Sequence, residues 1–189
     1  MKKVILGLSG ERGSFSEEAA LLYIEKSGID ATLDYLIDME GVLSALHLGD
    51  IDIGVFPVVN KRGGLVTMAF DAMGKYLFTP IDHFWMDVRQ YLLVKKGVQP
   101  NEIQQIVSHP QAILQCQRFL QNDYKDIKII EWEDTAKAAK DLALGTLDYK
   151  SAIIAPLRSA EMYQLEVLSE NIQDENPNLT AFIVAKRYI

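Results

Sequence analysis

The sequence has few of the residues that form covalent or metal crosslinks. Of its 189 residues, one is cysteine, Cys116, and three are histidine. A single cysteine cannot form an intramolecular disulfide, and no Cys/His spacing matches a structural zinc site. We therefore expect no bound metal, and a reducing, cytoplasmic setting.

Long apolar runs are also missing. The first run, residues 4–8, is five residues long and ends at Ser9-Gly10-Glu11-Arg12. It is too short for the apolar core of a signal peptide and far too short to cross a bilayer. No later run approaches that length, so we expect neither a secretory leader nor a membrane partner.

Positive charge is the third scarcity. Lysine and arginine number 19 against 26 acidic residues, which gives a net charge of −7 and a pI of about 5.0. Without a basic stripe a nucleic-acid partner is not expected. The 49% hydrophobic and 24% charged fractions are those of an ordinary globular protein. An anionic ligand would need cations or backbone amides concentrated locally.

An internal repeat with an offset of 96 residues organises the chain. Each half has an acidic helix N-cap, an apolar helical stripe, a Leu-Gly stop and an apolar strand followed by or ending in Pro. Upstream, strands at 4–8 and 103–107 lead into helices that begin near Ser14 and Pro110, so each half reads β-α-β-α-β. The landmarks are Asp38, Leu48-Gly49, Asp52 and Pro57, matched by Asp134, Leu144-Gly145, Asp148 and Pro156.

This pattern predicts an α/β fold of two similar lobes with parallel strands. The expected lobes are 1–78 with 178–189, and 79–177. The chain would cross between them near a strand at 88–94 and before a strand at 179–185. A cleft between the lobes is then the expected ligand site. One continuous sheet is the alternative.

Four segments contain polar groups suited to chemistry. Ser14 and Glu17 have the spacing of a capping box, where free amides suit an anion, although a plain helix cap is the commoner explanation. Asn60, Lys61 and Arg62 follow a strand and offer an amide and two cations, or form a solvated turn. The other two segments are Ser108-His109-Pro110-Gln111 with Gln115, and Asn178-Leu179-Thr180.

The last two segments also have ordinary structural readings. Pro110 suits the first turn of a helix, which places Ser108 or His109 near its start, with Ser108 and Gln115 able to share one helical face. A histidine beside proline is more often a capping residue than a catalyst, and no triad partner is evident. Thr180 could donate a hydrogen bond to a leaving oxygen, or simply begin a strand.

Together these segments resemble the catalytic domain of prephenate dehydratases across essentially all 189 residues. The matching motifs are Gly10-x-x-Gly13-Ser14-Phe15-Ser16, Gly54-Val55-x-Pro57, Ser108-His109-Pro110-Gln111-Ala112 with Gln115-Cys116, Thr135-Ala136-x-Ala138-Ala139, and Asn171-Ile172-Gln173-Asp174 with Asn178-x-Thr180. The resemblance implies two α/β lobes like those of type II periplasmic binding proteins. It also implies no metal or organic cofactor, and a possible homodimer.

The implied reaction converts prephenate, a small dicarboxylate, to phenylpyruvate with loss of water and carbon dioxide in phenylalanine biosynthesis. By resemblance, Thr180 would hydrogen-bond to or protonate the departing hydroxyl, while Asn60, Ser108 and Gln115 would position the ring and carboxylates. Amides at the two helix starts would meet the carboxylates. The further residues expected to bind substrate are Ser14, Phe15, Lys61, Arg62, His109, Gln111 and Phe182.

The sequence departs from the family pattern at two motifs. Val59-Asn60-Lys61 replaces Glu-Asn-Ser/Thr, and Thr180-Ala181-Phe182 replaces Thr-Arg-Phe. A lost arginine could weaken anion binding, with Lys61 and Arg62 as substitutes. A prephenate decarboxylase-like relative and a non-catalytic binder of prephenate or an aromatic keto acid are therefore the alternatives. Neither a regulatory ACT domain nor a fused chorismate mutase is expected.

Overall fold

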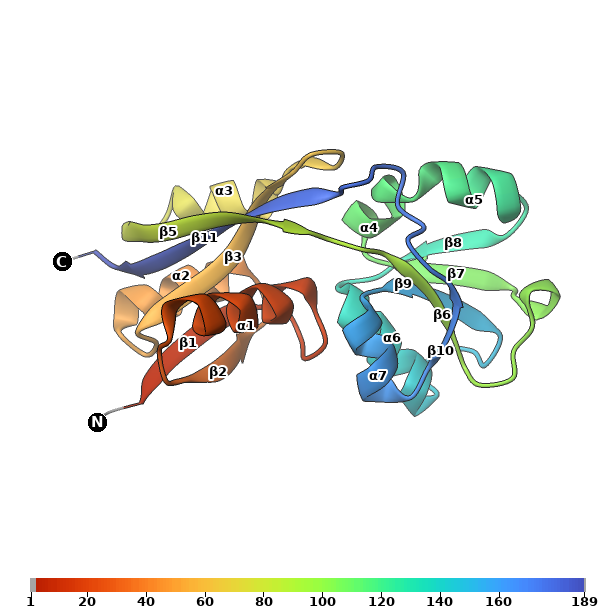
Figure 1. Ribbon diagram of the computed structural model, residues 1–189, viewed down its shortest axis with the longest axis horizontal. Helices are drawn as coiled ribbons and strands as arrows, with labels where there is room; N and C mark the ends of the chain where they lie inside the picture. The colour runs from red at the N-terminus through yellow and green to blue at the C-terminus, as the bar shows by residue number, and fades with distance from the viewer. Residues whose placement is uncertain (1–2, 189) are drawn as a thin grey trace. The chain divides into compact units, whose positions relative to one another are not determined.

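The computed structural model describes residues 3–188, which form two compact units. The first unit takes the chain up to Asp87 and again from Leu179, and the second unit is Val88–Asn178. The chain therefore passes between the units twice (Figure 1). The first boundary lies later than the expected position 78, because strand β5 (Phe78–Asp87) pairs along its length with β11 (Leu179–Arg187) of the first unit.

The first unit is built on a sheet with the strand order β2-β1-β3-β11-β5. Strand β1 is parallel to both β2 and β3, whereas β11 is antiparallel to both β3 and β5. A short strand, β4, pairs with β3. The remaining elements of this unit are β1 (Val4–Ser9), α1 (Phe15–Ser27), β2 (Ala31–Leu36), α2 (Met39–Leu48), β3 (Ile53–Asn60), β4 (Gly64–Leu65) and α3 (Thr67–Met73).

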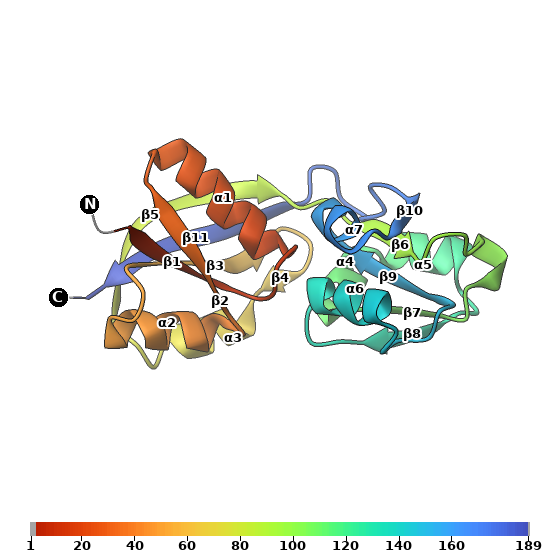
Figure 2. The ribbon, with the colours of Figure 1, turned by 90° about the horizontal axis from the view of Figure 1, so that it is seen from below.

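Helices cover both faces of this sheet (Figure 2). Helix α1 packs against one face, where Val55 and Phe182 are buried, and α2 and α3 pack against the other, where Phe56 and Val58 are buried. Adjacent residues of β3 thus point to opposite faces, as strand geometry requires. Gly54 lets α2 approach closely, because a Cβ there would lie 2.7 Å from a side-chain carbon of Val42.

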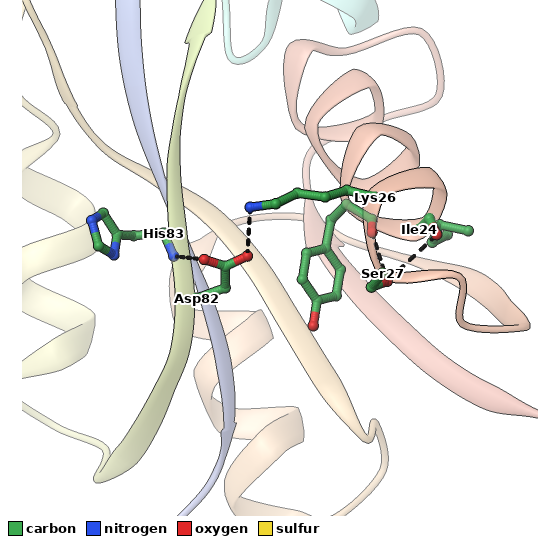
Figure 3. A network of polar contacts seen from close by, with 6 residues as sticks. Ile24, Lys26, Ser27, Asp82 and His83 are labelled. Carbon is green, nitrogen blue, oxygen red and sulfur yellow. Dashed lines mark hydrogen bonds and ion pairs between the residues drawn. The ribbon is translucent and has the colours of Figure 1, made fainter.

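The C-terminal end of α1 is attached to the edge strand β5 (Figure 3). Lys26 Nζ donates to Asp82 Oδ2 at 3.1 Å, and the His83 backbone N–H donates to Asp82 Oδ1 at 2.8 Å. These two contacts lower the pKa of the Asp82 carboxyl. Surface ion pairs of this kind contribute at most about 1 kcal/mol, so the pair adds little to the stability of the unit.

The second unit is built on a sheet with the order β10-β6-β9-β7-β8. Strand β7 is parallel to β8 and β9, while β6 is antiparallel to β9 and β10. The strand expected at 88–94 is shorter, since β6 begins at Tyr91. The elements of the second unit are β6 (Tyr91–Val94), η1 (Pro100–Glu102), β7 (Gln105–Ser108), α4 (Pro110–Gln115), α5 (Gln117–Asp123), β8 (Lys128–Glu131), α6 (Thr135–Leu144), β9 (Ser151–Ala155), α7 (Leu157–Tyr163) and β10 (Glu166–Ser169).

The repeat inferred from the sequence is present in the structure. Asp38 caps α2 by accepting from Gly41 N at 2.8 Å, and Asp134 caps α6 by accepting from Lys137 N at 2.9 Å. Gly49 and Gly145 end these helices in the left-handed conformation, with φ of 84° and 83°. The parallel strand triplets β2-β1-β3 and β8-β7-β9 correspond, and their separation into two sheets excludes the single-sheet alternative for residues 3–188.

Among residues 3–188 no helix combines the length and the apolar character that a membrane crossing requires.

Candidate functional site

A buried polar pair lies where β3 ends and β11 begins. The register of the two antiparallel strands places Thr180 opposite Asn60, although 120 residues separate them in sequence. Asn60 Nδ2 donates to Thr180 Oγ1 at 2.8 Å, and the two residues are 3% and 6% exposed. The strand pairing therefore brings together two of the residues expected from sequence to be catalytic.

Asn60 is held on both sides of its amide. Its Oδ1 accepts from the backbone N–H groups of Arg62 at 2.9 Å and Gly63 at 2.6 Å, a turn that asparagine commonly forms. Its Nδ2 also donates to the Leu179 carbonyl at 3.3 Å. Because Thr180 Oγ1 accepts from Asn60, the threonine can direct its own hydroxyl hydrogen to another acceptor. Lys61 and Arg62 are exposed in the turn after Asn60.

The residues that follow Thr180 face two different layers. Ala181 is paired with Val59, and both pack against the core beneath α2 and α3. Phe182 lies in the core beneath α1, where its ring stacks on Phe84 with centroids 5.9 Å apart and planes 16° apart. The structure thus places Phe182, expected to bind substrate, in the packed interior of the first unit.

The start of α1 has a denser set of contacts than the sequence predicts. Ser14 is the N-cap and its hydroxyl accepts from Glu17 N at 3.3 Å, as the capping-box spacing predicts. The Glu17 carboxylate accepts from Gly13 N at 2.6 Å and from the Tyr35 hydroxyl at 2.8 Å. The Arg12 guanidinium lies 5.3 Å from the centre of the Tyr35 ring. Nothing in the local sequence pattern identifies Tyr35 as a partner of this turn.

Phe15, the first residue of α1, is partly buried against the core on that side of the sheet. It completes the set of first-unit residues expected at the site. Of these, Asn60 and Thr180 are in direct contact, and Ser14 and Phe15 lie at the start of α1.

In the second unit the corner between β7 and α4 holds three of the expected residues. Ser108 is the last residue of β7 and is fully buried, and its hydroxyl donates to the Ile154 carbonyl of β9 at 2.6 Å. It therefore does not share a helical face with Gln115, because it precedes the helix. His109 is the N-cap of α4 and its Nδ1 accepts from Gln111 N at 3.2 Å.

The environment of His109 favours the neutral ring. Burial lowers the pKa of His109, and the nearby carboxylates of Asp134 and Glu131 oppose that shift. A ring whose Nδ1 accepts a hydrogen bond must be unprotonated at that atom. Gln111 Oε1 is buried and has no hydrogen-bond partner among residues 3–188.

Gln115, the last residue of α4, belongs to a cluster of buried amides. Its Oε1 accepts from Gln90 Nε2 at 3.0 Å and from Asn178 Nδ2 at 2.8 Å. From the sequence, Asn178 was named only as part of a motif and Gln90 was included only within an expected strand, so neither contact with Gln115 was predicted. Cys116 follows Gln115 and is fully buried, and burial together with the charge of Asp174 raises the pKa of its thiol.

Within the described part of the chain, no group of three or more histidine, cysteine, aspartate or glutamate side chains is placed to hold a metal ion.

Comparison with known proteins identifies the family. The family model described as prephenate dehydratase matches residues 6–188. The chain is 32% identical over 186 residues to arogenate dehydratase/prephenate dehydratase 1 of Arabidopsis thaliana, a match covering 98% of this chain and 45% of that protein. The chain therefore spans less than half of this relative.

Solved structures agree with this assignment. The prephenate dehydratase of Arthrobacter aurescens, solved with L-Phe, superposes with a TM-score of 0.85 at 27% identity, covering 98% of this chain and 61% of that one. A periplasmic substrate-binding protein of an ABC transporter from Coxiella burnetii shares the fold, at 18% identity and a TM-score of 0.55 over 97% of this chain and 84% of that one. The fold expected from the sequence is confirmed, and the chain belongs to the prephenate dehydratase family.

Proposed function

We propose that this chain converts prephenate to phenylpyruvate, with loss of carbon dioxide and water. The observation that carries the proposal is the hydrogen bond from Asn60 Nδ2 to Thr180 Oγ1 at 2.8 Å. It occupies a lone pair of the threonine oxygen and leaves the hydroxyl hydrogen to be donated. A donor at that atom is what a departing hydroxyl group requires.

The chemistry needs little else from the protein. As the ring carboxylate leaves as carbon dioxide, its electron pair enters the ring and the hydroxyl at the opposite carbon is expelled. The hydroxyl takes up one proton to leave as water, and aromatisation of the ring drives the reaction. Thr180 donates a hydrogen bond to that oxygen as negative charge develops on it, which is the stage at which a fixed donor lowers the barrier.

The remaining residues divide into those that contact substrate and those that hold others in place. Gln115 is proposed to bind a substrate oxygen. Asn60 holds Thr180 in place, and Ser108 holds the corner between β7 and α4. Lys61 and Arg62, exposed beside Asn60, supply positive charge for the carboxylates. Ser14, Phe15, His109 and Gln111 stand at the starts of α1 and α4, where backbone amides favour anions.

The test is incubation of purified protein with prephenate, followed by identification of the product. We expect phenylpyruvate from the wild type, and a loss of about 100-fold or more in kcat for Thr180→Val, which keeps the shape but removes the donor. Arogenate should be offered as well, because the name of the Arabidopsis relative joins both substrates. A non-aromatic decarboxylation product, or binding without turnover by folded protein, would contradict the proposal.

A cytoplasmic location and a homodimer are part of the same proposal. The single buried cysteine suits a reducing compartment. Exposed apolar side chains on α3 and β5, among them Met68, Phe70 and Trp85, are candidates for a dimer contact. Sedimentation velocity would show a species of twice the 21.3 kDa chain mass if the dimer forms.

A further inference from the structure

Three buried side-chain amides of the second unit form a continuous hydrogen-bonded relay. Asn178 Nδ2 donates to the Val88 carbonyl at 2.8 Å and to Gln115 Oε1 at 2.8 Å. Gln90 Nε2 donates to the same Gln115 Oε1 at 3.0 Å. The relay links the start of the second unit, the end of α4 and the last residue of the unit.

The polarity of the relay is determined by its chemistry. A backbone carbonyl can only accept, so the Asn178 atom that contacts Val88 must be the nitrogen. That nitrogen also faces Gln115, so the Gln115 atom there must be the oxygen. Gln90 must then present its nitrogen to the same oxygen. With Oε1 occupied by two donors, Nε2 of Gln115 is the atom left to donate elsewhere.

Gln90 is held firmly in this arrangement although one of its atoms is unsatisfied. Its backbone N–H donates to Gln173 Oε1 at 2.9 Å, and its carbonyl accepts from Ile172 N at 3.0 Å. The residue is 1% exposed, yet its Oε1 has no hydrogen-bond partner among residues 3–188. A buried unpaired acceptor is destabilising, and the hydrogen bond from Gln90 Nε2 to Gln115 Oε1 is what offsets that cost in this orientation of the amide.

We propose that Gln90 is a positioning residue that, together with Asn178, holds the Gln115 amide with Nε2 toward the substrate, where it donates to a carboxylate oxygen. This inference rests on the proposed function, because Gln115 is the residue that contacts substrate. Gln90 acts only through Gln115. Without Gln90, the Gln115 amide has a single remaining restraint on Oε1 and can rotate to present its oxygen, which repels a carboxylate.

The first test is Gln90→Met, which preserves length and removes both the donor and the unsatisfied oxygen. The fold should therefore be retained while the relay is broken. We expect the KM for prephenate and the Kd for phenylpyruvate to rise about tenfold, with a smaller change in kcat. Gln115→Met should raise KM at least as much, and adding Gln90→Met to it should have no further effect, since both changes act through one amide.

A second variant gives a readout that a purely structural role would not affect. In Gln90→Glu, a protonated acid can still donate to Gln115 Oε1, whereas the ionised carboxylate cannot. The KM ratio of variant to wild type should therefore be near one at low pH and increase as the new carboxyl ionises, with a midpoint raised by burial. A ratio that does not change with pH would overturn the inference.

The matched control is Gln105→Met in the same unit. Gln105 Nε2 donates to Ser151 Oγ at 2.8 Å and takes no part in the relay. It should lower stability with no change in KM. If Gln90→Met leaves KM unchanged in an active enzyme, or affects KM no more than this control does, Gln90 does not position Gln115.

Failure of the proposed function is separately visible, because the wild type would then form no phenylpyruvate. The relay is still tested in that case by NMR of the side-chain amides in ¹⁵N-labelled protein. The Gln115 NH₂ signals should shift in Gln90→Met and not in Gln105→Met. Unshifted Gln115 signals would overturn the inference independently of turnover.

Discussion

Val59 and Ala181 lie directly opposite each other across β3 and β11, one residue away from the Asn60–Thr180 pair in both strands. Val59 and Ala181 both pack against the core beneath α2 and α3. In β11 the neighbours Thr180 and Ala181 point to opposite faces of the strand, so the Ala181 side chain points away from that of Thr180. These are the two positions at which an acid and an arginine are expected from the family pattern. Their pairing means that charges introduced at both positions would face each other.

This pairing predicts how charges introduced at the two positions will behave. Val59→Glu and Ala181→Arg should each lower the free energy of unfolding by about 1–3 kcal/mol, because each places an uncompensated charge in a partly buried position. The double variant should lose less than the sum of the two, since the charges then face each other. Urea unfolding of the four proteins measures the coupling.

The same four proteins test whether the missing arginine matters for turnover. Since position 181 faces away from Thr180, kcat/KM of the double variant should stay within about threefold of the wild type. A rise of about tenfold or more would show that an arginine at this position does reach the substrate.

Asn60→Asp should impair turnover while retaining the turn. The carboxylate keeps the acceptor for Arg62 N and Gly63 N but loses the donor to Thr180 Oγ1, so the threonine hydroxyl turns its hydrogen toward the carboxylate. We expect kcat to fall about 100-fold with a thermal midpoint close to that of the wild type. Thr180→Ser, which keeps the hydroxyl, is the control and should retain most activity. Equal losses in both variants would contradict the hydrogen-bond assignment.

Gly54→Ala should destabilise the first unit. The added methyl would lie 2.7 Å from Val42 Cγ1 and 2.9 Å from Leu46 Cδ1, so α2 must move off β3 at a cost of about 1–3 kcal/mol. Gly41→Ala in the same helix is the control, because its nearest contacts would be 3.5 Å. It should be neutral or stabilising by up to about 1 kcal/mol. Thermal unfolding of both proteins compares the two sites.

His109 should make stability pH-dependent. Burial lowers its pKa, so the unfolded chain binds a proton at a higher pH than the folded protein does. The stability contributed by the neutral ring is then present above about pH 6.5, the ordinary value, and is lost as pH falls toward the lowered folded pKa. Urea midpoints measured from pH 8 to pH 5 should fall more for the wild type than for His109→Asn, which retains a capping group. Parallel curves would contradict this.

Cys116 should be unreactive in the folded protein. It is fully buried, and burial with the Asp174 charge raises the pKa of its thiol, so the reactive thiolate is scarce. Ellman's reagent at pH 8 should label it only as the second unit unfolds. Rapid labelling in native buffer would show that this region opens readily.

Local signals account for what the sequence predicted well. Asp38, Asp134, Gly49 and Gly145 cap their helices through contacts within four residues, which a linear pattern can reveal. No strand was expected from the sequence at 78–87, where β5 contains Pro80, a residue found in sheets mainly on edge strands such as β5. Its partner lies about a hundred residues away.

The candidate site was likewise predictable from the sequence only in part. Asn60 and Thr180 could be named from motifs, but their hydrogen bond depends on a strand register that the local sequence does not encode. Gln90 was placed within a strand, whereas its backbone N–H donates to Gln173 and its side-chain amide donates to Gln115, two residues from distant segments. Ser108 was expected near the start of the helix, able to share a face with Gln115, but His109 is the N-cap of α4 and Ser108 is the last residue of β7.

The interior position of β11 determines the order in which the two units can fold during synthesis. Strand β11 separates β3 from β5, so the first sheet is incomplete until residues 179–187 have left the ribosome. The second unit is finished earlier, and its two ends are hydrogen-bonded, Val88 N to the Asn178 carbonyl at 2.8 Å and Asn178 Nδ2 to the Val88 carbonyl at 2.8 Å. During translation the inserted unit can therefore fold first, and the unit that begins the chain is the last to be completed.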